Sequence, residues 1–159
     1  MPTIKKDEKK VQDVPAVADT SLLNAGKYEV TSNSTFTVKL NLFLQDGRWM
    51  VVDRDMKGSD HHEVVFRMWT FDEAIEFRKK ATSLHAETRQ QLLDDDHLNE
   101  IKVRKLMQSW TFDRENSRLK IHRVGGVLTD ESLEIIKKLQ ENILRYIHLQ
   151  MNVVLERGM

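Results

Sequence analysis

LNEIKVRKLMQSWTF, residues 98–112, has the apolar spacing of one face of a helix. The residues at positions i, i+3, i+4 and i+7 of this stretch are Val103, Leu106, Met107 and Trp110. This spacing predicts a single apolar stripe on a helix over residues 96–112. The helical patterns on either side, residues 71–93 and 129–156, each need an apolar partner. We therefore expect residues 96–112 to form the central packing helix of the chain.

Residues 35–69 show the alternating pattern of a small antiparallel sheet. Every second residue from Phe36 to Leu44 is apolar, which predicts a half-buried strand with one apolar face. The dipeptide Asp46-Gly47 favours the positive φ angles of a type I′ hairpin turn, and an apolar return strand follows from Trp49. A third strand is predicted around Val64. The sequence thus predicts an α+β fold, in which a three-stranded antiparallel sheet packs against about three C-terminal helices.

Capping residues indicate where the predicted helices begin. Thr70 followed by Glu73 forms a capping box, and residues 94–96, three aspartates, place negative charge at the start of the central helix. Thr129 precedes the last helix, and the glycine pair at 125–126 before it is expected to form a bend. The residues expected in the core are Trp69, Leu106, Trp110, Ile136, Leu139 and Ile143.

Composition limits the classes of function. A chain of 159 residues suits one domain, which we assign to residues 21–159. Residues 1–20 contain both prolines and no usable period, so they are expected to form an extended or disordered N-terminal arm. The absence of cysteine excludes disulfides, thiolate zinc sites and cysteine nucleophiles. No apolar run reaches the length of a membrane span and no secretory signal is evident, so we expect a soluble protein without membrane contact.

The four residues Asp60-His61-His62-Glu63 are the first place to look for a metal site, because imidazole and carboxylate groups suit zinc, nickel or iron. Adjacent residues of an extended chain point to opposite faces, however, so His61 and His62 cannot easily bind one ion. The sequence has no nucleophile elbow and no phosphate-binding loop. We therefore predict a protein that is not an enzyme and has no catalytic residue, cofactor or metal. A metal-dependent enzyme that uses residues 60–63 is a rival hypothesis.

Clusters of basic residues at 78–80 and 102–105 raise the alternative of a nucleic-acid-binding accessory protein. Lysine and arginine total 25, as do aspartate and glutamate, so no global positive field would attract nucleic acid. Acidic residues such as Glu76 and Glu100 lie close to the clusters and cancel much of their local field. The charge pattern therefore favours solvated helix faces, and binding to nucleic acid remains the alternative.

The last predicted helix, residues 129–156, is apolar on more than one side. One stripe runs from Leu133 to Val154, and further apolar residues lie outside it. A helix with this pattern is either deeply buried or in contact with a partner. In a chain of this size we favour a partner, and the interface candidates are Leu144, Leu149 and Val153.

Three segments carry a family resemblance: VRKLMQSWTF at 103–112, GVLTDE at 126–131, and a long amphipathic helix that contains YIHLQM at 146–151. In this order, across about residues 64–156, the chain resembles small structural and tail-assembly proteins of tailed bacteriophages. The resemblance implies a non-enzymatic structural subunit of the virion, in the tail, neck or baseplate. A tail assembly chaperone that is not retained in the particle is the alternative.

The same resemblance implies partners and a location. The partners would be other phage structural proteins and copies of the chain itself, joined by protein–protein contacts. The location would be the virion, or the host cytoplasm during assembly.

Overall fold

The computed structural model describes residues 28–31, 33–84 and 88–157. The chain divides into two units, Met1–Thr31 and Ser32–Met159, and every helix and strand described below belongs to the second. The predicted N-terminal arm, residues 1–20, lies outside the described residues. No helix in the described ranges combines the length and the apolar composition that crossing a membrane requires.

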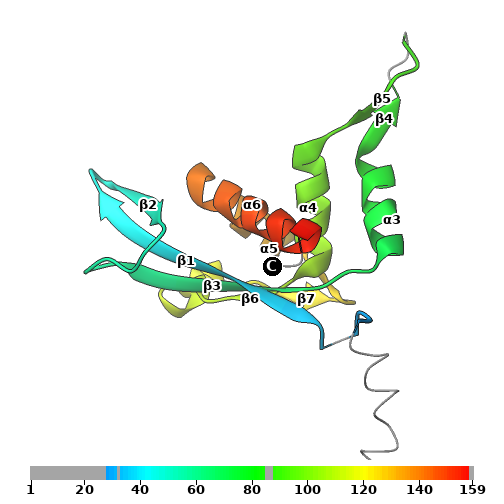
Figure 1. Cartoon of the computed structure of the whole chain (residues 1–159). Helices are drawn as coiled ribbons and strands as arrows, with labels where there is room; N and C mark the ends of the chain where they lie inside the picture. The colour runs from blue at the N-terminus through cyan, green and yellow to red at the C-terminus, as the bar shows by residue number, and fades with distance from the viewer. Residues whose placement is uncertain (1–27, 32, 85–87, 158–159) are drawn as a thin grey trace, which may run out of the picture. The chain divides into compact units, whose positions relative to one another are not determined.

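Four antiparallel strands form the main sheet, in the order β2-β1-β3-β6 (Figure 1). The strands are β1 (Thr35–Gln45), β2 (Arg48–Val52), β3 (Asp60–Arg67) and β6 (Met107–Trp110). Asp46 and Gly47 connect β1 to β2 with φ angles of 52° and 80°, both positive as a type I′ turn requires. The predicted hairpin and three-stranded antiparallel sheet are confirmed, and β6 adds a fourth strand.

The stretch predicted as one central helix contains both a helix and a strand. Helix α4 (Asp95–Leu106) begins at the N-cap Asp94, whose carboxylate accepts a hydrogen bond from the His97 N–H. The chain becomes extended at Met107 and β6 then pairs with β3, so the prediction of a helix as far as residue 112 is wrong. The four residues that suggested one stripe are all buried, but they lie on two elements. Val103 and Leu106 belong to α4, whereas Met107 and Trp110 belong to β6. Pairing with β3 outweighs the helical spacing here.

The prediction of a helix over residues 71–93 is also wrong beyond residue 81. Helix α3 (Phe71–Ala81) starts as predicted, because Thr70 and Glu73 form a capping box. The chain becomes extended at Thr82, and β4 (Thr82–Leu84) pairs antiparallel with β5 (Gln91–Leu93). This pairing reverses the chain, so α3 and α4 lie side by side. Their ends farther from the main sheet carry the β4–β5 pair, which we call the tip (Figure 1).

The last predicted helix is two helices, α5 (Asp130–Lys137) and α6 (Glu141–Arg157). Thr129 caps α5 as predicted, since its hydroxyl accepts a hydrogen bond from the Ser132 N–H. The break is made by short-range hydrogen bonds, in which Lys138 and Leu139 donate to the carbonyls of Ile135 and Ile136. Bonds of this type tighten the final turn of a helix. Before α5, the predicted bend at the two glycines joins the short strands β7 (Arg123–Val124) and β8 (Val127–Leu128).

One hydrophobic core lies between the main sheet and the helices. Helix α6 contacts β1 and β2 and lies across one face of the sheet (Figure 1). The buried apolar side chains of β1, β3 and α6 are Val38, Leu40, Leu42, Val64, Phe66, Ile143, Ile147 and Met151. Of the residues expected in the core, four are buried: Leu106, Trp110, Ile136 and Ile143. The other two, Trp69 and Leu139, are partly buried and pack against the core.

Candidate functional site

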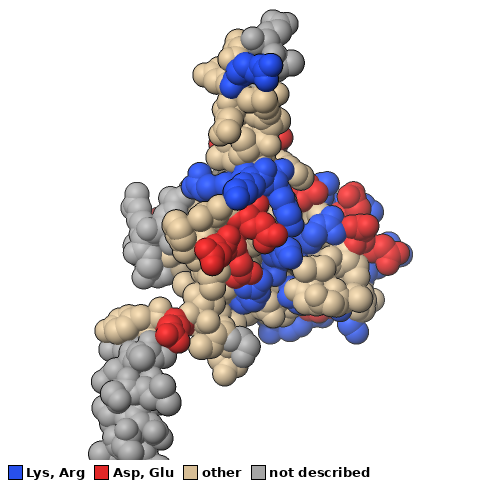
Figure 2. Space-filling model, turned by 90° about the vertical axis from the view of Figure 1, so that its right-hand side faces the viewer, with Lys and Arg blue, Asp and Glu red and all other residues tan. Residues whose placement is uncertain are grey.

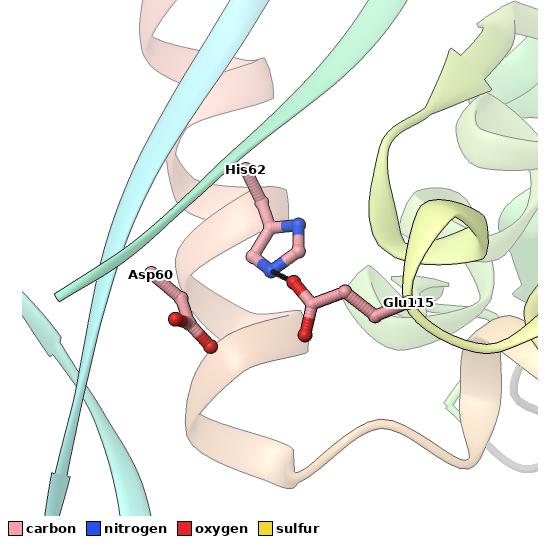
Figure 3. Close-up of side chains that lie close together, drawn as sticks. All are labelled: Asp60, His62 and Glu115. Carbon is pink, nitrogen blue, oxygen red and sulfur yellow. Dashed lines mark ion pairs between the residues drawn. The ribbon is translucent and has the colours of Figure 1, made fainter.

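Asp60, His62 and Glu115 form a group of potential metal ligands in the described part of the chain. Asp60 and His62 are alternate residues of β3, so their side chains lie on the same face of the sheet. Glu115 ends the short 3-10 helix η2 (Phe112–Arg114), which follows β6. One ligand atom from each residue lies within 4.8 Å of the others, and both carboxylates lie on the Nε2 side of the imidazole (Figure 3).

The imidazole of His62 is fixed in position by its neighbours. The side chain is only 4% exposed, and its ring stacks on Phe112 with the ring centroids 4.1 Å apart. Nδ1 lies 3.1 Å from the Thr111 hydroxyl oxygen, and Nε2 lies 3.1 Å from Glu115 Oε2. The Thr111 hydroxyl also accepts a hydrogen bond of 2.9 Å from the Glu63 N–H. Stacking and hydrogen bonds together define the orientation of both ring nitrogens.

Burial lowers the pKa of His62, and the negative charges of Glu115 and Asp60 partly oppose this effect. The balance favours the neutral imidazole over the imidazolium. A neutral imidazole has a lone pair that can coordinate a metal ion. A cavity of about 310 Å³ opens beside the group and is also lined by Trp49, Leu119 and Ile143. Because the Glu115 side chain is 62% exposed, the group is accessible to solvent.

His61 and Glu63 belong to the contiguous set that the sequence suggested, and the structure separates both from the group. His61 is exposed, with Nε2 3.2 Å from Asp55 and Nδ1 2.7 Å from the Asn41 side-chain oxygen. Glu63 is also exposed. Sequence reasoning missed Glu115, because only the pairing of β6 with β3 brings it to His62. Glu115 could have been found only if residues 107–110 had been recognised as a strand.

The three interface candidates on the last helix do not form one patch. Leu144 is partly buried and lines a cavity of about 260 Å³ between α4, α5 and α6. Leu149 is 57% exposed, whereas Val153, one turn further along α6, is partly buried. His148 lines the same cavity as Leu144, and its buried Nδ1 has no hydrogen-bond partner.

Exposed apolar side chains gather instead on α3 and the tip, at Phe71, Ile75, Leu84, Leu92 and Leu93. The strands of the tip, TSL and QLL, contain no charged residue. Figure 2 shows this uncharged surface, with lysine and arginine side chains above and below it. Among the residues that the structure describes, β4 and β5 pair only with each other, so each has an edge without a strand partner there. A groove of about 570 Å³ between the tip and the end of α3 is lined by Ile75, Leu84 and Leu93 together with the basic residues Arg78 and Lys79.

The two basic clusters are partly neutralised by neighbouring groups. Lys80 lies 3.6 Å from Glu76, and Arg104 lies 2.6 Å from Asp130. Lys102 donates a hydrogen bond of 2.8 Å to Asn152. Red and blue side chains are interspersed on this face of the molecule (Figure 2).

Comparison of the chain with protein-family models, with curated proteins and with solved structures finds no match.

Proposed function

We propose that this chain is a non-enzymatic structural subunit of a tailed-phage particle, in the tail, neck or baseplate, and that two copies associate through their tips. The observation that supports this proposal is the uncharged, leucine-rich surface of β4 and β5. The sequence resemblance to small structural and tail-assembly proteins supplies the phage setting.

The tip has the properties of a surface that is covered in an assembly. A two-stranded antiparallel sheet with no cover is marginally stable in water. Its open edges present N–H and C=O groups that another strand can pair with. Leu84, Leu92 and Leu93 are exposed, and burying apolar area stabilises a contact by about 25 cal/mol per Å². A partner at the tip would therefore bury leucines and complete the hydrogen bonding of an edge strand.

A second copy of the chain suits the tip better than a charged partner. In a two-fold contact each copy offers the same surface, so like charges would repel across the axis. The strands of the tip carry no charge, so this repulsion is confined to the flanking basic residues such as Arg78 and Lys79. Each leucine of one tip can then pack against leucines of the other.

Particle assembly needs further contacts with other phage structural proteins, either in the virion or in the host cytoplasm during assembly. A tail assembly chaperone would use the same tip contact and leave before the particle is complete. Mass spectrometry of purified particles of the phage that encodes this chain distinguishes the two roles. A structural subunit is present in the particles, whereas a chaperone is absent.

The mass of the full chain in solution, measured by light scattering over a range of concentrations, tests the tip contact. The monomer has a mass of 18.7 kDa, and we expect twice this mass at high concentration. Leu92→Asp should restore the monomer, because an unpaired carboxylate is costly to bury in an apolar contact. Leu149→Asp is the matched control, since Leu149 is an exposed leucine on α6, and it should leave the dimer intact.

Two results would count against association of two copies through the tip. A wild-type chain that stays monomeric at every concentration would contradict self-association. Dissociation by Leu149→Asp but not by Leu92→Asp would place the interface on the last helix, where the sequence predicts it.

A further inference from the structure

The face of β3 that carries His62 has no role in the proposed assembly. We propose that Asp60, His62 and Glu115 bind one divalent transition-metal ion, with Zn²⁺ as the best match. One imidazole nitrogen and two carboxylate oxygens form a ligand set that suits zinc, whereas Ca²⁺ and Mg²⁺ prefer oxygen ligands alone.

The distances allow coordination after small side-chain rotations. Zinc bonds of about 2.0–2.2 Å in a tetrahedral site place neighbouring ligand atoms about 3.4 Å apart. His62 Nε2 and Glu115 Oε2 are already 3.1 Å apart. The widest separation within the group is no more than 4.8 Å, and Asp60 and Glu115 both have room to turn because neither is buried. The buried His62 would be the fixed ligand, and the two carboxylates would adjust around it (Figure 3).

The hydrogen bond at the other ring nitrogen supports the same conclusion. A histidine that binds zinc usually donates its second N–H to a nearby acceptor, which fixes the tautomer. The Thr111 hydroxyl, 3.1 Å from Nδ1, can accept or donate a hydrogen bond. With an ion at Nε2, the single proton of the neutral imidazole would reside on Nδ1, and Nδ1–H would donate to this hydroxyl. Thr111 and Phe112 thus hold the ring in the orientation that coordination needs.

A bound ion would link β3 to the segment after β6. Asp60 and His62 belong to β3, and Glu115 ends η2, so the ion would fasten η2 to the sheet. Three protein ligands leave one tetrahedral position for water or a small ligand from the adjacent cavity. The sequence predicts no metal because the contiguous set at residues 60–63 cannot converge. In the structure the group contains Glu115 and neither His61 nor Glu63. Its three ligand atoms lie close enough together to face one ion.

Calorimetric titration of the untagged full chain with ZnCl₂ tests the site. We expect one ion per chain. Asp60→Asn and Glu115→Gln should each weaken binding at least tenfold, because each removes a ligand. Glu63→Gln is the matched control for lost carboxylate charge, since Glu63 is a neighbour on β3 outside the group, and it should leave the affinity unchanged. His61→Gln should also have no effect, because His61 interacts with Asp55 and Asn41 instead.

Three results of the titration would overturn the proposal: no saturable binding, unchanged affinity in both Asp60→Asn and Glu115→Gln, or an equal loss of affinity in His61→Gln. Nuclear magnetic resonance of the ring nitrogens separates coordination from a change in folding. Zinc should shift the Nε2 resonance of His62 while Nδ1 carries the ring proton. A shift confined to other histidines would also overturn the proposal.

Thr111→Val, which removes a positioning residue, should weaken zinc binding, and Thr111→Ser should restore it.

Discussion

The main sheet and the tip are both antiparallel and both contain leucines, but in the described part of the chain only the main sheet is covered by helices. Leu40 on β1 is 1% exposed because helices pack over its face of the sheet, whereas Leu92 on β5 is 45% exposed. The residue type and the kind of strand are the same in both regions. The difference indicates that apolar burial is concentrated under the helices, whereas the tip leaves its leucines exposed.

The largest expected effect is on the covered region. Trp110 is buried on β6, where it pairs with Val64 of β3 and contacts Phe112 edge to face. Its indole N–H donates a hydrogen bond of 2.8 Å to the Leu119 carbonyl. Trp110→Ala should lower the free energy of unfolding by about 3 to 5 kcal/mol, measured by urea denaturation. Trp110→Phe retains most of the ring volume and should lose less. An unchanged midpoint in Trp110→Ala would show that β6 contributes little to stability.

Hydrogen bonds around the buried Ser132 predict the next largest effect. Ser132 is 1% exposed, and its hydroxyl accepts a hydrogen bond of 2.6 Å from the His122 N–H. Ser132→Ala should lower the free energy of unfolding by about 1 to 3 kcal/mol, because the partly buried N–H of His122 loses this acceptor. The exposed serine at position 83 on the tip is the control, and its replacement by alanine should change little. Equal effects of the two substitutions would contradict the contrast between covered and uncovered regions.

Local signals in the sequence located most of the elements correctly. The turn at Asp46 and Gly47, the capping box at Thr70 and the cap at Thr129 depend on neighbouring residues, and all three are present in the structure. The errors occur where long-range pairing decides the structure. Residues 107–110 become a strand because β3 is beside them, and residues 82–84 because β5 is beside them. Neither partner is evident from the spacing of one segment.

The metal-ligand group shows the same limit. The sequence indicates His62 as a potential metal ligand, from its residue type and its acidic neighbours, and Asp60 belongs to the same strand. Glu115 follows β6, so its approach to His62 depends on the strand that the helical spacing concealed. The tip was missed for a related reason. A continuous helix over residues 71–93 would have directed its apolar stripe to the core and left no uncovered leucines.

A pH effect is expected in the cavity between α4, α5 and α6, which has charged residues at its rim. Burial lowers the pKa of His148 below its ordinary value of 6.5, Arg145 adds to this effect, and Asp96 opposes it. Glu100, Lys137 and Glu141 also line the cavity. His148 has its ordinary pKa of 6.5 in the unfolded chain and a lower pKa in the folded chain. Between these two values the unfolded chain binds more protons than the folded chain, so the free energy of unfolding should fall as pH decreases below about 6.5.

Urea denaturation at several values between pH 7.5 and 5 measures this change, using wild type and His148→Gln. The difference between the two curves isolates His148, and the variant should lose less stability on acidification. Parallel curves would show that His148 keeps the same pKa in both states.

The smallest effect is expected at the tip. The same substitution, leucine to alanine, can be made there and in the main sheet, so the two regions can be compared directly. Leu92→Ala should change the free energy of unfolding of the monomer by no more than about 0.5 kcal/mol, because the side chain has few contacts to lose. Leu40→Ala removes the same atoms from the covered sheet and should cost about 2 to 5 kcal/mol. Both are measured at a concentration low enough to keep the chain monomeric, since association through the tip would add stability to the wild type. A loss above about 2 kcal/mol for Leu92→Ala would mean that the tip is already packed in the monomer. Its leucines would then serve the fold, and the partner contact would have to lie on another surface.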